Sequence, residues 1–369
     1  MATTTPTLEP AVSGSTDKPT TARAFGVTSS DSPVQPLTIE RRALRPEDVA
    51  IKISHSGICH SDLHMAHNDW GMSLYPMVPG HEIVGTVTGV GSAVTRFKVG
   101  DRAAVGCLVD SDLTCEHCKA GHEQFCDGGM VLTYSGIDKQ DGSTTQGGYS
   151  DHIVVRQEFV LRFPEALDPG SGAPLLCAGI TTYSPLRKFG VDSGQKVGIA
   201  GLGGLGHMGV KFANAMGAHV TMITTSPEKG EDARELGAHD VLLSTDEQAM
   251  ADAAGRFDFI LNTIPVSHDV GPYVNLLRPN GTMVVVGAID SLPGLHGAAL
   301  AMRNRSVAGS LIGGLPETQE MLDFCAEHGI HSEVEIIRAD QINEAWDRMK
   351  KGDVRYRFVI DMATMGENA

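Results

Sequence analysis

The sequence predicts an α/β protein of two domains, one rich in β-strands and the other built on a doubly wound parallel sheet. Its 369 residues exceed what one ordinary hydrophobic core accommodates. Up to about residue 165, segments such as 49–54 and 148–155 alternate apolar and polar residues, as half-buried strands do. From about residue 195, short apolar runs alternate with helix-like segments, which is typical of a parallel sheet covered on both faces.

Six apolar runs make up the expected parallel sheet, which is the number of strands in the doubly wound dinucleotide fold. They span residues 195–200, 219–225, 240–244, 257–262, 282–288 and 306–313. After residue 315 the pattern changes to helices expected over 316–329 and 340–352 and strands expected over 334–339 and 356–362. Asp340 is the expected N-cap of the second helix.

This change of pattern predicts that the chain returns to its first domain after completing the sheet. The expected β-rich domain covers 23–175 and 315–369, and the parallel-sheet domain is inserted over 176–314. Residues 1–22 are rich in Thr, Pro, Ser and Ala and lack core periodicity, so we expect a disordered tail there.

Composition and charge exclude several classes of partner. A formal net charge of -16 argues against nucleic acid, because a phosphate backbone requires a basic face. No apolar run approaches the length needed to cross a bilayer, and the first 22 residues contain no secretory signal. Seven cysteines, three of them within 115–126, favour metal binding over disulfides. We therefore expect a reducing, cytoplasmic setting.

A glycine-rich turn stands between the first run of the sheet and a helix-like segment that extends to about residue 216. It consists of Gly201, Leu202, Gly203, Gly204, Leu205 and Gly206. In this strand–turn–helix context the turn predicts a dinucleotide site. We expect Gly201 to permit the tight turn, Gly203 to let the pyrophosphate approach, and Gly206 to let the helix pack on the strand.

The end of the second run favours NADP over NAD. No carboxylate stands there to bind a ribose 2′-hydroxyl, and the residues are instead Thr224, Thr225 and Ser226. Their hydroxyls suit a 2′-phosphate, and Lys229 would pair with its charge. Glu228 opposes this interpretation unless its side chain points to solvent. The alternative for Lys229 is an ordinary solvated lysine at the start of a helix.

Three residues far apart in the sequence form a candidate catalytic metal site. Cys59 lies in the segment GICHSDLH over 57–64, His81 lies in PGHE, and Cys177 opens CAGITTYSPL. Two thiolates and one imidazole bind zinc and leave a fourth position for water or substrate. The alternative for either cysteine, considered singly, is a small buried apolar side chain.

The motifs GICHSD, VPGHEIVG, CAGITTYSPL and GLGGLGH together resemble those of zinc-containing medium-chain dehydrogenases/reductases. The resemblance is to the cinnamyl-alcohol-dehydrogenase-like group, in its bacterial aldehyde reductase branch, and it runs from about residue 23 to 365. It implies a GroES-like catalytic domain, an inserted Rossmann domain that binds NADP(H), and homodimers formed through the sheet edge at 306–313. Alcohol dehydrogenases are a known example of the Cys₂His zinc site.

The implied reaction is reversible hydride transfer between NADPH and an aldehyde. Trp70 and apolar residues near 288–289 and 312 suggest an apolar or aromatic substrate. By the resemblance, Asp62 orients the His81 imidazole, and Glu82 lies beside the metal as an occasional ligand.

The resemblance also implies a proton relay and further cofactor contacts. Ser61 would pass a proton between the alkoxide and the cofactor ribose, and His64, supported by Asp69, would continue the route to solvent. His60 is expected near the pyrophosphate. The residues expected around the nicotinamide are Thr181, Gly287, Ala288, Ser310 and Ile312.

A second cysteine-rich segment resembles the structural zinc lobe of this family but departs from its four-cysteine pattern. Cys115, Cys118 and Cys126 are present, while Asp112 stands in place of the first cysteine. A carboxylate oxygen also binds zinc, so Asp112 is the favoured fourth ligand. The alternatives are Cys107, His117 and His122, or a loop that has lost its metal.

Two other functions are weighed against the dehydrogenase. One is a carbon–carbon double-bond reductase on the same fold, in which zinc ligands or relay residues are often eroded. The other is a non-catalytic protein that binds zinc or a dinucleotide. The presence of Cys59, Ser61, His64, His81 and Cys177 favours the dehydrogenase over both.

Overall fold

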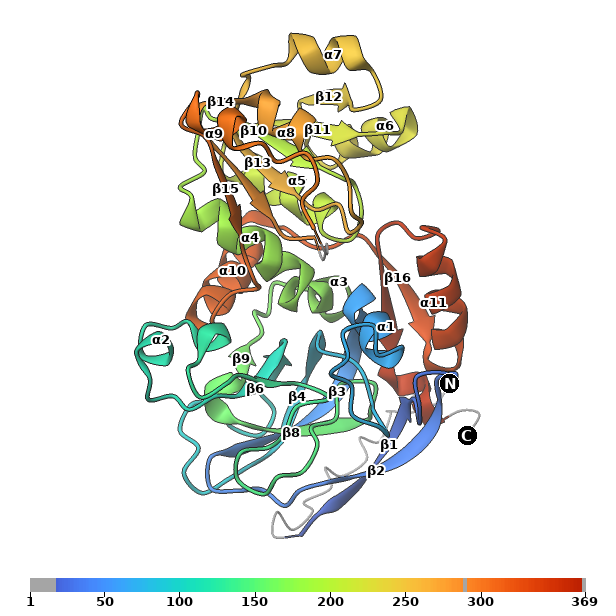
Figure 1. Ribbon diagram of the computed structural model, residues 1–369. Helices are drawn as coiled ribbons and strands as arrows, with labels where there is room; N and C mark the ends of the chain where they lie inside the picture. The colour runs from blue at the N-terminus through green and yellow to red at the C-terminus, as the bar shows by residue number, and fades with distance from the viewer. Residues whose placement is uncertain (1–17, 288–290, 367–369) are drawn as a thin grey trace, which may run out of the picture.

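The computed structural model of the protein describes residues 18–287 and 291–366, and a six-stranded parallel sheet forms the upper part of it in Figure 1. The strand order is β12, β11, β10, β13, β14, β15, so the chain starts in the middle and builds each half in turn. This confirms the predicted doubly wound sheet. The strands are β10 Lys196–Ala200, β11 His219–Thr224, β12 Asp240–Leu243, β13 Phe257–Asn262, β14 Leu277–Val285 and β15 Ser306–Gly309.

Helices connect consecutive strands of this sheet, as the alternating sequence pattern predicts. They are α5 Gly206–Ala215, α6 Pro227–Glu235, α7 Glu247–Asp252, α8 Gly271–Leu276 and α9 Gly297–Ala301. Before the sheet comes α4, Ala178–Lys188, and after it comes α10, Leu315–His328. Tyr183 of α4 packs against Phe212 of α5 and Phe324 of α10, with ring centroids 5.3 and 5.5 Å away. The three helices therefore meet in one aromatic cluster.

A second, largely antiparallel sheet of seven strands forms the lower part of the molecule (Figure 1). Its central strand β3 is long enough that β8 and β17 share one edge of it, at 48–52 and 55–58. Its strands are β3 Asp48–Ile58, β4 Ile83–Val90, β5 Arg102–Val105, β8 His152–Arg156, β9 Leu161–Arg162, β16 Val334–Arg338 and β17 Arg357–Asp361.

Two small two-stranded sheets and several short helices flank this sheet. The small sheets pair β1 Thr20–Gly26 with β2 Gln35–Arg41, and β6 Leu108–Asp110 with β7 Val131–Leu132. The helices are α1 His60–Ala66, α2 Glu116–Lys119, α3 Pro169–Gly172 and α11 Ile342–Lys350.

The last part of the chain returns to the first sheet, as predicted. Strand β17 pairs antiparallel with β3, and Phe358 lies opposite Ile58. The exact domain divisions, after residues 175 and 314, remain predictions. Ile312 and Leu315 pack against the hydrophobic cores of both parts, so the chain crosses between the cores at this point.

Two local predictions are wrong. Residues 20–22 belong to β1 and not to a disordered tail, because Ala22 is fully buried and pairs with Ile39 of β2. Asp340 does not cap α11, since it lies within a short 3₁₀ helix, Ala339–Gln341, and Gln341 occupies the N-cap. The Asp340 carboxylate instead accepts from Arg338 Nε at 3.2 Å. Residues 1–17 lie outside the described part of the chain.

Within the described ranges, no helix has the length and apolar character required to cross a membrane.

Candidate active site and metal centres

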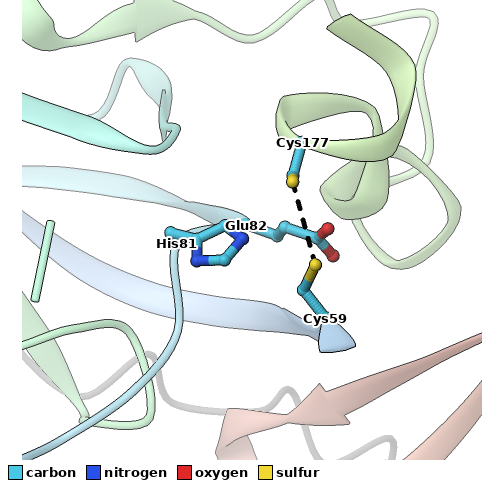
Figure 2. Close-up of side chains that lie close together, drawn as sticks. All are labelled: Cys59, His81, Glu82 and Cys177. Carbon is cyan, nitrogen blue, oxygen red and sulfur yellow. Dashed lines mark hydrogen bonds between the residues drawn. The ribbon is translucent and has the colours of Figure 1, made fainter. Parts of the chain in front are cut away.

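Four buried side chains meet between the two sheets, and Figure 2 shows them converging. Cys59 stands between β3 and α1 as the N-cap of that helix, and His81 and Glu82 directly precede β4. Cys177 is the N-cap of α4. Their ligand atoms all lie within 4.8 Å of one another. The structure thus brings together Cys59, His81 and Cys177, as predicted, with Glu82 beside them.

The separation of the two thiols fits a tetrahedral metal. The sulfurs of Cys59 and Cys177 are 3.8 Å apart and form no disulfide. Two sulfurs bound at about 2.3 Å to one tetrahedral centre would stand roughly 3.8 Å apart. The hydrogen bond from Cys177 holds the pKa of Cys59 well below its ordinary value. That shift favours the thiolate, which is the form that binds zinc.

Asp62 faces His81 from the side opposite the thiols. Its Oδ1 lies 3.5 Å from His81 Nδ1 and accepts the Gly80 N–H at 3.1 Å. Its Oδ2 accepts the Cys59 N–H at 2.9 Å and the Tyr149 hydroxyl at 3.0 Å. His81 Nε2 is buried and has no hydrogen-bond partner among the described residues. The ring therefore directs an unused nitrogen toward the thiols, which is the arrangement a metal-binding histidine requires.

Glu82 is held by a buried arginine. Arg357, at the start of β17, forms an ion pair with Glu82 Oε1, and both side chains are almost fully inaccessible. Burial raises the pKa of Glu82, and the adjacent guanidinium opposes that rise. Gly57 makes room for this arrangement, because a Cβ atom there would lie 2.0 Å from Glu82 Oε2. Within the described chain, Oε2 itself has no hydrogen-bond partner.

The predicted relay residues lie along α1 and just after it. Ser61 Oγ is 3.5 Å from the Cys59 sulfur. His64 Nδ1 is 2.8 Å from Asp69 Oδ2, and its ring stacks on Trp70 at 5.3 Å between centroids. His60 begins the helix, and its ring centroid is 6.5 Å from that of His64. The helix therefore runs from the thiol cluster toward the surface.

The second cluster is formed by the four residues favoured from the sequence, Asp112, Cys115, Cys118 and Cys126. Asp112 Oδ1 accepts the N–H groups of Thr114 and Cys115 at 2.8 and 2.9 Å. The Asp112 N–H points to the Cys126 sulfur at 3.3 Å. Three sulfurs and one carboxylate oxygen make the closed set of a structural zinc site.

The alternative ligands Cys107, His117 and His122 do not belong to this cluster. Cys107 instead contacts Cys177, which lowers the pKa of the Cys107 thiol. It also lines a small cavity of otherwise mostly apolar residues, which include Ile180 and Ile312. Cys107 therefore neighbours the first cluster.

The glycine-rich turn has the geometry expected of a dinucleotide loop. Gly201 adopts a φ of 90°, in the left-handed region that favours glycine. A Cβ on Gly206 would lie 1.9 Å from the Gly201 carbonyl oxygen, whereas one on Gly203 would meet open space. Gly204 lies against the Arg357 side chain. The remaining residues of the turn are Leu202, which is buried, and Leu205, the N-cap of α5.

The predicted 2′-phosphate residues gather where β11 ends and α6 begins. Thr224 is buried, and its Oγ1 accepts the Ser226 N–H at 3.3 Å. Thr225 and Lys229 are exposed, and Ser226 is the N-cap of α6. Glu228 is exposed, as the NADP interpretation requires, yet its Oε2 accepts the Ser226 hydroxyl at 2.6 Å. The sequence did not indicate this contact.

The residues expected around the nicotinamide come from three segments. Thr181 lies in the first turn of α4, one turn after Cys177. Gly287 follows β14, and a Cβ there would lie 2.2 Å from the Ile264 carbonyl oxygen. Ser310 and Ile312 follow β15, and Ile312 borders the cavity beside Cys107. Ala288 lies outside the described residues.

Comparison with known proteins decides the family. Residues 45–165 match the alcohol dehydrogenase GroES-like domain, and residues 204–327 match the zinc-binding dehydrogenase domain. An NADP-dependent alcohol dehydrogenase of Mycolicibacterium smegmatis is 52% identical over 94% of this chain and 99% of its own. An aldehyde reductase of Escherichia coli is 51% identical over 93% of this chain and 99% of its own. A cinnamyl alcohol dehydrogenase structure from Sorghum bicolor is 46% identical. It superposes with a TM-score of 0.90 over 93% of this chain and 98% of its own.

The chain belongs to the zinc-containing medium-chain dehydrogenases/reductases. Within that family it falls in the cinnamyl-alcohol-dehydrogenase-like group, and it is an alcohol dehydrogenase with a GroES-like and a Rossmann domain.

Three residues around the zinc cluster of this dehydrogenase were missed in the sequence. Arg357 touches both Glu82 and Gly204, and Tyr149 donates to Asp62. Tyr134 stacks on the His81 ring, with centroids 5.6 Å apart. None of the three lies in a recognisable motif. Their roles depend on tertiary contacts that residue spacing does not encode.

Proposed function

We propose that this dehydrogenase reduces apolar and aromatic aldehydes to alcohols with NADPH as the hydride donor. The observation that carries the proposal is the cluster of Cys59, His81 and Cys177. Its sulfurs already stand at a tetrahedral separation, and its imidazole presents a buried nitrogen without a partner among the described residues. The glycine-rich turn supports a dinucleotide as the second substrate.

Cys59, His81 and Cys177 would hold the catalytic zinc, and Glu82, whose carboxylate lies within the same cluster, would act as a fourth ligand. When bound, zinc polarises the aldehyde oxygen and the nicotinamide supplies the hydride. Asp62 fixes the His81 ring through Nδ1. Burial of the whole cluster excludes water and strengthens these electrostatic interactions.

Ser61, His64 and Asp69 supply the proton that the reduced substrate requires. Ser61 places its hydroxyl beside the Cys59 sulfur, at the inner end of α1. His64 has 36% of its side chain exposed and is hydrogen-bonded to Asp69, so it meets both solvent and the interior. An imidazole can both accept and donate a proton, so His64 is suited to carry one between solvent and Ser61.

The cofactor would lie across the carboxyl ends of the strands of the parallel sheet. The turn over 201–206 and the start of α5 would bind the pyrophosphate, with His60 nearby. Thr224, Thr225, Ser226 and Lys229 would bind the 2′-phosphate. The residues assigned to the nicotinamide are Thr181, Gly287, Ala288, Ser310 and Ile312. The apolar cavity beside Cys107 and the exposed Trp70 favour an apolar substrate.

Reduction of cinnamaldehyde by purified protein and NADPH tests this function. We expect cinnamyl alcohol as the product and no turnover by Cys59→Ser. Cys325→Ser is the matched control, because Cys325 is a buried cysteine on α10 outside both metal clusters and its loss should leave activity intact. A saturated aldehyde would show reduction of the carbon–carbon double bond instead. Failure to turn over any aldehyde would point to a non-catalytic binding protein.

Two further proposals concern assembly and location. The edge of the parallel sheet at β15 has no neighbouring strand on its outer side in the described chain, and Met302 and Leu311 nearby are exposed. A second copy pairing there about a two-fold axis would cover this edge. Light scattering that gave the mass of a single chain would refute the dimer. The seven free cysteines favour a cytoplasmic location, which fractionation of the native cell would test.

A further inference from the structure

The start of α6 contains a contact that the proposed function leaves unexplained. Ser226 Oγ donates to Glu228 Oε2 at 2.6 Å and accepts the Lys229 N–H at 3.4 Å. Ser226 is one of the hydroxyl residues assigned to the 2′-phosphate. Its proton is therefore directed at a carboxylate.

Charge makes this contact unfavourable for one cofactor. The hydrogen bond from Ser226 lowers the pKa of Glu228, so the carboxylate is ionised at neutral pH. A 2′-phosphate that took the Ser226 hydroxyl would have to displace Glu228 and remain beside its negative charge. Like charges at close range disfavour each other, and Lys229 offers one positive charge in compensation.

A ribose without the phosphate meets the opposite situation. Its 2′-hydroxyl is a donor, and a carboxylate at this end of the second strand is the acceptor by which NAD enzymes bind it. Glu228 follows the end of β11 by four residues and reaches back to the N-cap. The same carboxylate is thus an acceptor for NADH and a source of repulsion for NADPH.

We propose that Glu228 is a specificity-determining residue that weakens NADPH binding and allows this dehydrogenase to use NADH as well. The hydroxyls and Lys229 select the phosphorylated cofactor, and Glu228 limits the strength of that selection. The inference rests on the proposed function, because it takes the 2′-phosphate to bind at Ser226.

Equilibrium binding of NADPH and NADH to the zinc-loaded protein, followed by nucleotide fluorescence, tests the role of Glu228. Glu228→Gln keeps an acceptor for Ser226 and removes the charge. We expect the Kd for NADPH to fall about three- to tenfold, while the Kd for NADH rises because its 2′-hydroxyl loses a charged acceptor. Added salt should reduce the difference from the wild type, because it screens exposed charges.

Glu231→Gln is the matched control, since it removes the same charge from an exposed position one turn further along α6. It should change either Kd by less than about twofold. The inference is overturned if Glu228→Gln leaves the NADPH Kd unchanged, shifts both cofactors equally, or weakens NADPH.

Lys229→Ala separates this inference from the proposed function. If that variant weakens NADPH but not NADH while Glu228→Gln has no effect, the phosphate binds here and only the role of Glu228 fails. If Lys229→Ala weakens neither cofactor, the assigned phosphate site is itself wrong, and the role of Glu228 fails with it.

Discussion

At the scale of single residues, Asp62 shows how a charged group is made useful by complete burial. Its side chain is inaccessible, and its two oxygens accept from Cys59, Gly80 and Tyr149 while facing His81. A carboxylate can accept in all these directions at once, which offsets the cost of removing its charge from water. The same contacts fix the loop that carries Cys59.

Asp62→Asn should therefore disturb the catalytic metal site although it preserves size. The NH₂ group of asparagine would face at least one of the N–H or O–H groups whose hydrogen bond Asp62 now accepts. Two donors would then oppose each other. We expect a loss of catalytic zinc and a fall in kcat of about 10- to 100-fold. Metal analysis and steady-state kinetics measure both effects.

Tyr149→Phe is the control, since it removes only one of these hydrogen bonds. It should retain zinc and lower the free energy of unfolding by about 1 kcal/mol. Full zinc content and full activity in Asp62→Asn would refute the positioning role.

Sequence motifs identified the residues whose chemistry is written in their type, such as Cys59, His81 and Cys177. They did not identify Arg357, because the sequence around an arginine at the start of a strand does not indicate which side chains it contacts in the folded protein. Nor did they show that Glu228 turns back to Ser226. Side-chain direction at a helix start depends on local packing, which spacing does not fix.

At the scale of elements, the lobe between β6 and β7 is built around the cluster of Asp112, Cys115, Cys118 and Cys126 more than around a core. Its helix α2 has only four residues, and Cys118 is the one buried residue in it. Isolated helices of this length are not stable in water. Asp112 contributes by accepting two backbone N–H groups, which holds its pKa below the ordinary value and keeps it ionised.

Asp112→Ala tests whether this residue completes the structural zinc site. We expect the metal content to fall from about two zinc ions per chain to about one, because three thiolates alone leave the set open. Cys107→Ser serves as the comparison and should retain about two, since Cys107 lies beside Cys177. An unchanged content in Asp112→Ala would exclude it as an essential ligand.

At the scale of the whole molecule, His207 joins the two parts of the chain. It lies in α5, stacks on Tyr356 with centroids 5.0 Å apart, and has its Nε2 2.9 Å from Ser332 Oγ. Its Nδ1 is 3.2 Å from the Gly203 carbonyl oxygen and so carries the proton. Burial lowers the pKa of His207 to about 3, so the folded protein holds it neutral.

This burial predicts a pH dependence of stability. The unfolded chain protonates His207 below pH of about 6.5, whereas the folded chain does not until about 3. The contribution of neutral His207 to the free energy of unfolding is therefore complete above pH of about 6.5. It is lost progressively as the pH falls from there toward about 3. Between pH 7 and 5 the loss should be about 2 kcal/mol.

Denaturant unfolding of wild type and His207→Gln at both pH values measures this contribution. The variant keeps a polar side chain but does not titrate, so its stability should fall less over the same interval. Equal falls in the two proteins would show that His207 is not the group responsible.

The doubly wound sheet could be predicted because six apolar runs and their turns are local signals. The residue at which the first strand begins could not be predicted, since Thr20–Ala22 form a strand only through pairing with β2. In the same way, α11 begins at Ile342 because residues 339–341 form a 3₁₀ turn, in which Asp340 accepts from Arg338. Tertiary partners decide such boundaries.

The pairing of β17 with β3 also sets an order of events during synthesis. Phe358 lies opposite Ile58, so β3 lacks this partner until the segment over 357–361 has been synthesised. The same segment supplies Arg357, so Glu82 has no ion-pair partner in Arg357 until that segment is in place. Until then part of the central strand of the first sheet is an open edge that can pair with other chains. Slow pairing of β17 with β3 would therefore leave this part of β3 open to association with other chains.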